Sequence, residues 1–134
     1  MVASAAQRRN ATIYTAPDGA FRLARDPDVV RAPDAAFVRW DRMPPKEERS
    51  GDLPVAPNLA VEVVSPGGTR REVAAKVALS LRLGVEMVWV ADERSRTVTV
   101  HRRDREPGVL SAGDVLDGED VLPGFRWPLS DIFR

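Results

Sequence analysis

The chain has 134 residues, of which 43% are hydrophobic and 30% are charged, and its formal net charge is zero. This length and composition suit one soluble globular domain over residues 1–134, and the balanced charge argues mildly against sequence-independent nucleic-acid binding. The lack of cysteine excludes disulfides, zinc–thiolate sites and thiol catalysis, and the default location is the cytoplasm because no apolar run has membrane-spanning length.

Two short strands are expected near the start of the chain. Ala11–Thr15 and Phe21–Arg25 both alternate in polarity, and the strong turn signal Pro17-Asp18-Gly19 lies between them. We therefore expect these strands to form a hairpin. Residues 1–10 contain arginines without an apolar stretch behind them, which excludes a secretory signal and predicts a disordered start.

A third strand is expected over Ala35–Val38, and Asp34 stands at its start behind Pro33, which restricts the backbone there. An aspartate that follows proline is usually a turn or cap residue, so this interpretation stands beside a functional one. Residues 41–57 then form a proline-rich loop of mixed charge, in which Lys46 is expected to be exposed.

The run Leu59–Val64 is the strand around which the rest of the chain is organised. Five of its six residues are apolar, which is typical of a strand covered on both faces, yet Glu62 lies within it. An ionised carboxylate removed from water costs on the order of several kcal/mol unless it is compensated. Glu62 therefore faces a metal ion, a lysine or a water-filled cleft, unless the strand is at an edge and the carboxylate points into solvent.

A helix is expected from Thr69 to about Leu83. Thr69 and Glu72 form a capping-box pattern at its start, and Gly84 ends it. Its buried stripe repeats every four residues and consists of Val73, Val77 and Leu81. Lys76 borders this stripe, and the simplest interpretation is a lysine whose stem lies on the core while its ammonium group reaches water.

Two further strands, Val85–Ala91 and Thr97–Arg102, are expected to form a second hairpin around a turn at residues 92–95. His101 is the only histidine and is expected at the surface, because it lies at an outward position of its strand. A short strand is expected at Val109–Ser111. The apolar tail should dock on the core, and its large residues are Phe125, Trp127, Leu129, Ile132 and Phe133.

Asp34, Glu62 and Lys76 form the candidate site. The order strand, helix, strand from Glu62 to Val90 is that of a βαβ unit, so we expect an α/β (α+β) protein. Two carboxylates and a lysine are a minimal set for metal-assisted phosphodiester cleavage. Hard oxygen ligands hold magnesium, and a lysine stabilises negative charge that develops on the phosphate.

Four segments, in this order, resemble the Uma-two family of bacterial restriction endonucleases, which have the PD-(D/E)XK nuclease fold. Residues 30–38 are similar to the family's R-x-P-D-[VA]-x-F-V segment, and residues 56–66 to its aPdLvvEVlSP segment. Lys76 with residues 84–92 is similar to K…GV…vWvvD, and residues 116–133 to the closing segment with LpGF. The similarity covers nearly all of the chain after residue 10.

The resemblance implies a restriction-endonuclease-like fold with a mixed sheet core, a flanking helix and strand hairpins at both ends. It also implies a DNA endonuclease in which Asp34 and Glu62 bind Mg2+ or Mn2+. The family pattern places a lysine two residues after the acidic one, where this chain has Val64, so Lys76 is expected to replace it. Two arginines that begin the helix are candidate phosphate contacts, although solvated residues are the simpler interpretation: Arg70 and Arg71.

Two departures from the family pattern keep other functions open. Asn58 stands where members often have aspartate, at a position expected to be peripheral. Members usually begin with several dozen residues that carry a helix and a further acidic residue, whereas this chain starts near the first expected hairpin. A sheet face left uncovered would favour a homodimer. The alternatives are an inactive nuclease-fold module that binds nucleic acid or protein, and a degenerate remnant.

Overall fold

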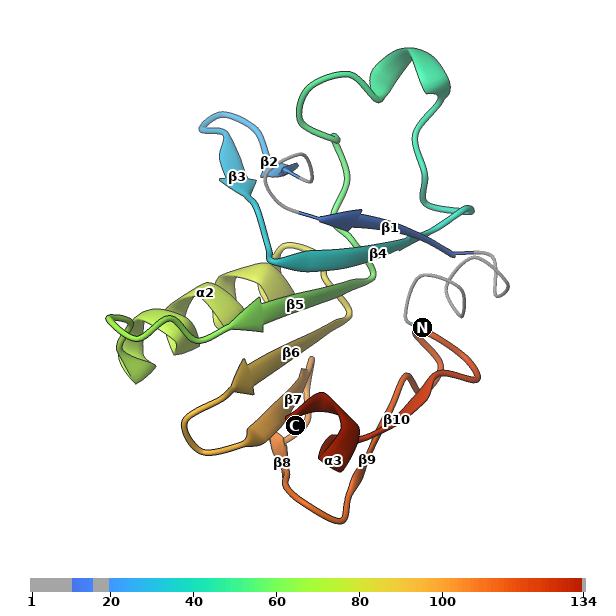
Figure 1. Ribbon diagram of the computed structural model, residues 1–134. Coiled ribbons are helices and arrows are strands. Elements are labelled where there is room, and N and C mark those ends of the chain that lie inside the picture. Colours follow the sequence, from blue (N-terminus) through green and yellow to red (C-terminus); the bar gives the residue numbers. More distant parts are fainter. Residues whose placement is uncertain (1–10, 16–19, 134) are drawn as a thin grey trace.

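A mixed six-stranded sheet forms the centre of the protein, with strand order β1-β4-β5-β6-β7-β8 (Figure 1). The computed structural model describes residues 11–15 and 20–133, so the expected disorder of residues 1–10 and the expected turn at Pro17–Gly19 lie outside the described residues. β5 and β6 are parallel, and the other neighbouring strands are antiparallel. The strands are β1 (Ala11–Thr15), β4 (Ala35–Arg39), β5 (Leu59–Val63), β6 (Met87–Asp92), β7 (Thr97–Arg102) and β8 (Gly108–Leu110).

Helix α2 (Arg70–Arg82) connects the parallel strands β5 and β6, as the βαβ pattern predicts. Its start is capped by Thr69, whose Oγ1 accepts a hydrogen bond from the Glu72 N–H at 3.1 Å. Its end is followed by Gly84 at φ +117°, a left-handed conformation that favours glycine. Val77 is buried towards the sheet, so the predicted stripe is confirmed.

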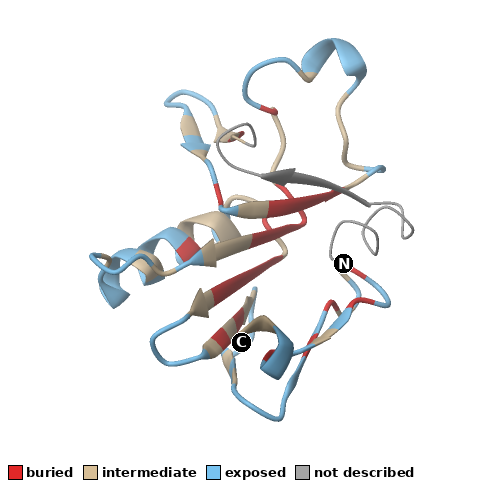
Figure 2. Ribbon diagram, viewed as in Figure 1, coloured by how far each residue is buried: buried red, intermediate tan, exposed pale blue. Residues whose placement is uncertain are grey.

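Side chains alternate along the strands and fill two cores on opposite faces of the sheet. Figure 2 shows buried residues along the central strands β4, β5, β6 and β7. On one face, α2 covers Ala60, Val88 and Val90. On the other, the C-terminal segment supplies β9 (Val115–Asp117), β10 (Arg126–Pro128) and α3 (Leu129–Ile132). The buried residues of this segment pack against Phe37, Leu59 and Trp89 of the sheet. They are Leu116, Leu122, Phe125 and Leu129. The apolar tail therefore docks as expected.

The expected first hairpin is wrong. β1 pairs with β4 in the main sheet, whereas β2 (Phe21–Ala24) pairs with β3 (Val29–Arg31). The strand β3 was not predicted, because its three residues are too short to show an alternation. Asp26 adopts a left-handed φ of +53°, which allows a tight reversal between β2 and β3. The reversal after β2 therefore determines its pairing partner.

The loop at residues 41–57 is anchored at its far end and contains one 3-10 turn, η1 (Lys46–Glu48). Leu53 is buried beside Phe21, Ala36 and Val38. The Leu53 carbonyl accepts the Arg22 N–H at 2.7 Å, so this end of the loop extends the edge of the β2–β3 hairpin. Lys46 is exposed, as expected. Among the described residues, no helix combines the length and apolar character needed to cross a bilayer.

Candidate active site

Asp34 and Glu62 lie opposite each other across β4 and β5. The register pairs Ala36 with Ala60 and Ala35 with Val61, and the next step along both strands brings Asp34 opposite Glu62. Asp34 Oδ2 accepts a hydrogen bond from the Val63 N–H at 2.7 Å, so this side chain extends the hydrogen bonding between the strands by one step. Directly opposite residues in an antiparallel pair have Cβ atoms about 5 Å apart, and like charges there repel. A positive charge near the two carboxylates would therefore stabilise them.

Glu62 lies on an interior strand, between β4 and β6, which excludes the edge-strand alternative. It shares a face of the sheet with Ala60, the face covered by α2. Burial raises the pKa of the Glu62 carboxyl above its ordinary value, and the negative charge of Asp34 raises it further. Among the described residues, no hydrogen bond or ion pair is made by this carboxylate. Glu62 is thus a partly buried acid without a direct partner.

Lys76 contributes one of the positive charges near Glu62. Its side chain is exposed on α2, and its charge lowers the pKa of Glu62, against the effects of burial and Asp34. Val64, at the position where the family pattern has lysine, packs instead in the core beneath α2. The structure therefore brings Asp34, Glu62 and Lys76 to one region, at the carboxyl end of β5. Open α/β sheets commonly bind ligands at this end of their parallel strands.

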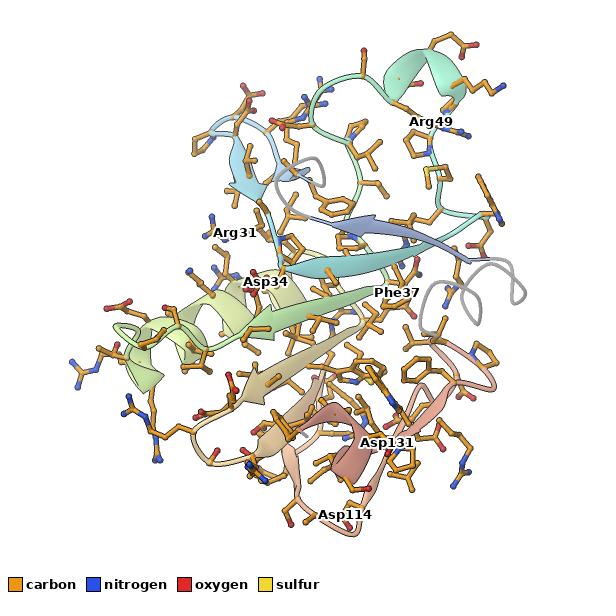
Figure 3. The ribbon with its side chains drawn as sticks, viewed as in Figure 1. Arg31, Asp34, Phe37, Arg49, Asp114 and Asp131 are labelled. Atoms are coloured by element: carbon orange, nitrogen blue, oxygen red, sulfur yellow. The ribbon has the colours of Figure 1, made fainter. Side chains whose placement is uncertain are left out.

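Arg31 is a second cation at this site, and the sequence analysis assigned it no role. It ends β3, three residues before Asp34, and its charge also lowers the pKa of Glu62. Its Nη1 donates a hydrogen bond to the Val30 carbonyl at 2.9 Å. Figure 3 shows Arg31 and Asp34 at the junction of β3 and β4. A signal was present, because Arg31 belongs to the same R-x-P-D segment that drew attention to Asp34.

Arg70 and Arg71 are exposed on the first turn of α2. Their charges are not among those that shift the pKa of Glu62. The positions are compatible with phosphate contacts and equally with solvated helix residues, so both residues stay predictions.

The oxygen ligands fit a hard divalent cation. The described residues contain no group of three or more histidine, cysteine, aspartate or glutamate side chains that could hold a metal. Mg2+ is commonly held by one or two carboxylates, with water and phosphate oxygens completing its shell. The pair Asp34 and Glu62 provides two hard ligands, and their repulsion is relieved by a cation. A site that the substrate itself completes is therefore consistent with this geometry.

A polar network occupies the opposite end of β5. Asn58 was expected to be peripheral to the candidate site, and it lies at this opposite end of β5, where it is only 1% exposed. Its Oδ1 accepts the Arg39 N–H at 2.8 Å, and its Nδ2 donates to Glu86 Oε2. Arg39 and Arg42 form ion pairs with the same Glu86 oxygen at 3.3 and 3.1 Å. Asn58 is therefore a buried structural residue, and aspartate there would place a second negative charge beside Glu86.

The cavity that the structure contains near this network is separate from the candidate site. Its volume is about 230 Å3, and Glu86, Met87, Arg102, Arg103 and Glu119 are among its lining residues. Arg102 donates to both carboxylate oxygens of Glu119, and Arg103 donates to the Leu81 carbonyl at 2.7 Å. These charged groups already have partners within the protein. The cavity therefore does not compete with the carboxylate pair as the centre of the chemistry.

Comparisons with known proteins agree with this architecture. The family model Uma2, described as "Putative restriction endonuclease", matches residues 2–130. The chain is also similar to a solved structure described as "a putative nuclease belonging to DUF820 from Anabaena variabilis ATCC 29413", with a TM-score of 0.80 and 21% sequence identity. That similarity covers 98% of this chain and 75% of the other, and it confirms the expected fold class. No protein with a curated description matches.

Proposed function

Because this chain belongs to the Uma2 family of restriction endonucleases, we propose that it is a metal-dependent DNA endonuclease that hydrolyses phosphodiester bonds. The observation that carries the proposal is the pair of facing carboxylates, Asp34 and Glu62, with Lys76 beside them. The pair lies at the carboxyl end of β5, where a substrate can approach. Paired carboxylates with a neighbouring lysine are a minimal set for metal-assisted phosphodiester cleavage.

In this proposal, Asp34 and Glu62 hold Mg2+ or Mn2+. When bound, such a cation polarises the phosphate and activates water for attack. The residues of the chain orient the phosphorus between the carboxylates and Lys76. Water attacks the phosphorus, the P–O bond to the leaving sugar oxygen breaks, and that oxygen takes a proton. The Lys76 ammonium group stabilises the negative charge that grows on the phosphate oxygens during this step.

DNA is the proposed partner, and the cytoplasm is the proposed location because a DNA endonuclease must meet its substrate. A homodimer would present one site to each strand of a duplex, so we also propose a homodimer. Val109 is 64% exposed on the edge strand β8 and gives such a dimer one apolar contact. Sedimentation velocity with and without a DNA duplex measures the oligomeric state directly.

Cleavage of supercoiled plasmid tests the proposal, with Mg2+ or Mn2+ and with excess chelator. The purified chain should nick the plasmid only with metal, and Glu62→Ala and Lys76→Ala should abolish the nicking. Lys46→Ala is the matched control, because Lys46 is the other lysine and is exposed on η1. Nicking that survives Glu62→Ala would show that the site is wrong. A folded chain that binds DNA without cleaving it would favour the binding module instead.

A further inference from the structure

Arg31 holds hydrogen-bond donors that the protein itself leaves unused. A guanidinium group offers five N–H donors in a rigid plane. Among the described residues, the Val30 carbonyl takes one of them, through Nη1 at 2.9 Å. Within the part of the chain that the structure describes, the Arg31 Nε is buried and has no hydrogen-bond partner. A buried donor left unsatisfied destabilises the fold, so its retention here calls for an explanation.

The position of Arg31 is fixed by the same chain segment as Asp34. Arg31 is the last residue of β3, and the buried Pro33 separates it from Asp34. Proline fixes its own φ and restricts the residue before it, so the backbone between the arginine and the aspartate has little freedom. Figure 3 shows both residues at this junction. The arginine is thereby held beside the carboxylate pair and cannot drift away with a loop.

The charges at the site favour an anionic ligand once a metal is present. Asp34 and Glu62 contribute two negative charges, and Lys76 and Arg31 contribute two positive ones. A divalent cation on the carboxylates leaves the group with an excess of two positive charges. A phosphodiester supplies one negative charge in the ground state and a second as its transition state forms. Lysine alone would leave this second charge unbalanced.

We propose that Arg31 binds a non-bridging oxygen of the DNA phosphate at this site, an assignment that rests on the proposed nuclease function. The guanidinium approaches from β3, while Lys76 approaches from α2, so the phosphate is held from two elements. Arginine suits this role because its planar fork presents two parallel donors to phosphate oxygens.

Salt-dependent DNA binding tests this assignment separately from cleavage. The affinity of a short DNA duplex is measured by fluorescence anisotropy in Ca2+, over a range of salt concentrations, for the wild type, Arg31→Met and Arg31→Lys. Each phosphate contact adds about 0.9 to the slope of log affinity against log salt. Arg31→Met should lower the slope by about this amount and weaken binding about tenfold or more. Arg31→Lys should keep the slope while losing most of the cleavage rate.

The control and the contrary outcomes are equally definite. Arg105→Met removes an exposed arginine beyond the far end of β7 and should leave both slope and cleavage unchanged. Calorimetric binding of Mn2+ alone should be kept or strengthened in Arg31→Met. An unchanged slope and unchanged cleavage in a folded Arg31→Met would overturn the assignment while the nuclease function stands. If the wild type never cleaves DNA but Arg31→Met still lowers the slope, the nuclease function is rejected and Arg31 remains a phosphate contact.

Discussion

The two ends of β5 treat a partly buried glutamate in opposite ways. At the start of the strand, Glu86 accepts hydrogen bonds from Asn58 and Arg42 and is paired with Arg39. At its end, Glu62 has cations nearby but no direct partner among the described residues. The first group is satisfied within the protein, and the second is not. A polar cluster that is complete stabilises a fold, whereas one that is incomplete is prepared for something from outside.

The difference also explains the pKa of Glu62. Its carboxyl is desolvated and repelled by Asp34, and Lys76 and Arg31 compensate only in part. A ligand cation would complete that compensation. The geometry thus separates an acid that the protein satisfies by itself, Glu86, from one that it leaves without a direct partner among the described residues, Glu62.

The largest expected effect is the loss of cleavage when Glu62, but not Glu86, is substituted. Glu62→Gln should reduce metal-dependent plasmid cleavage about 10²–10³-fold or more, because it removes a charged ligand at the reacting phosphate. Glu86→Gln should leave the cleavage rate within about threefold at a temperature where the protein is folded. Initial rates of nicking measure both. Comparable losses in the two variants would show that the two ends do not differ in the way proposed.

For stability, the order is reversed: substitution of Glu86 should cost more than substitution of Glu62. Glu86→Ala should lower the free energy of unfolding by about 2 kcal/mol, because Asn58, Arg39 and Arg42 lose their common acceptor. The group is partly exposed, so the loss is smaller than for a fully buried pair. Urea unfolding followed by tryptophan fluorescence gives the value. Glu47→Ala, at an exposed position of η1, serves as the control and should change it little.

Metal should stabilise only a protein with an intact carboxylate pair. At a Mg2+ or Mn2+ concentration 100 times the dissociation constant, linkage adds about 2.7 kcal/mol to the free energy of unfolding. Thermal melts with and without metal should show this gain for the wild type and for Glu86→Gln. They should show none for Glu62→Gln. A gain that persists in Glu62→Gln would assign the metal to another site.

The smallest expected effect is the pH dependence due to Glu62. Its pKa in the folded protein lies above the ordinary 4.5, so the folded state keeps a proton that the unfolded chain has already lost. Without metal, the free energy of unfolding should therefore fall as the pH rises from 4.5 through the raised pKa. Glu62→Gln should be more stable than the wild type at pH 7 by less than about 1 kcal/mol, since the carboxylate is partly solvated.

Urea unfolding in chelator between pH 4 and pH 7 should show the two curves converging at the acidic end. Curves that stay parallel throughout would mean that the Glu62 pKa is not raised in solution.

Strong local signals made most of the fold predictable. Three elements have clear patterns in their own residues. They are the capped helix with its stripe of Val73, Val77 and Leu81, the apolar run of β5, and the second hairpin. The pairing of β1 with β4 was not predictable, because a short strand carries no information about distant partners. The strand β3 was missed for a related reason, since three residues are too few to define a period.

The candidate site was predictable in part. Glu62 could be found because a carboxylate inside an apolar strand is unusual, and Asp34 because it belongs to the R-x-P-D segment that is similar to the family pattern. Their facing register follows from strand pairing, which no local pattern contains. Arg31 was overlooked among many arginines. Asn58 lies away from the candidate site, as expected, but its burial was not predictable, because it depends on partners from distant segments. The roles of these residues at the site stay predictions.

The hydrogen bond between the Val63 N–H and Asp34 gives this side chain a structural role in the sheet in addition to its charge. It ties the start of β4 to the end of β5 beyond the last backbone pair, so the spacing of the carboxylates is inherited from the spacing of the strands. Because this spacing depends on backbone pairing, movements of the surrounding loops should leave the two carboxylates in place. One oxygen of Asp34 is committed to the frame, which leaves the other as a single point of attachment for whatever the site binds.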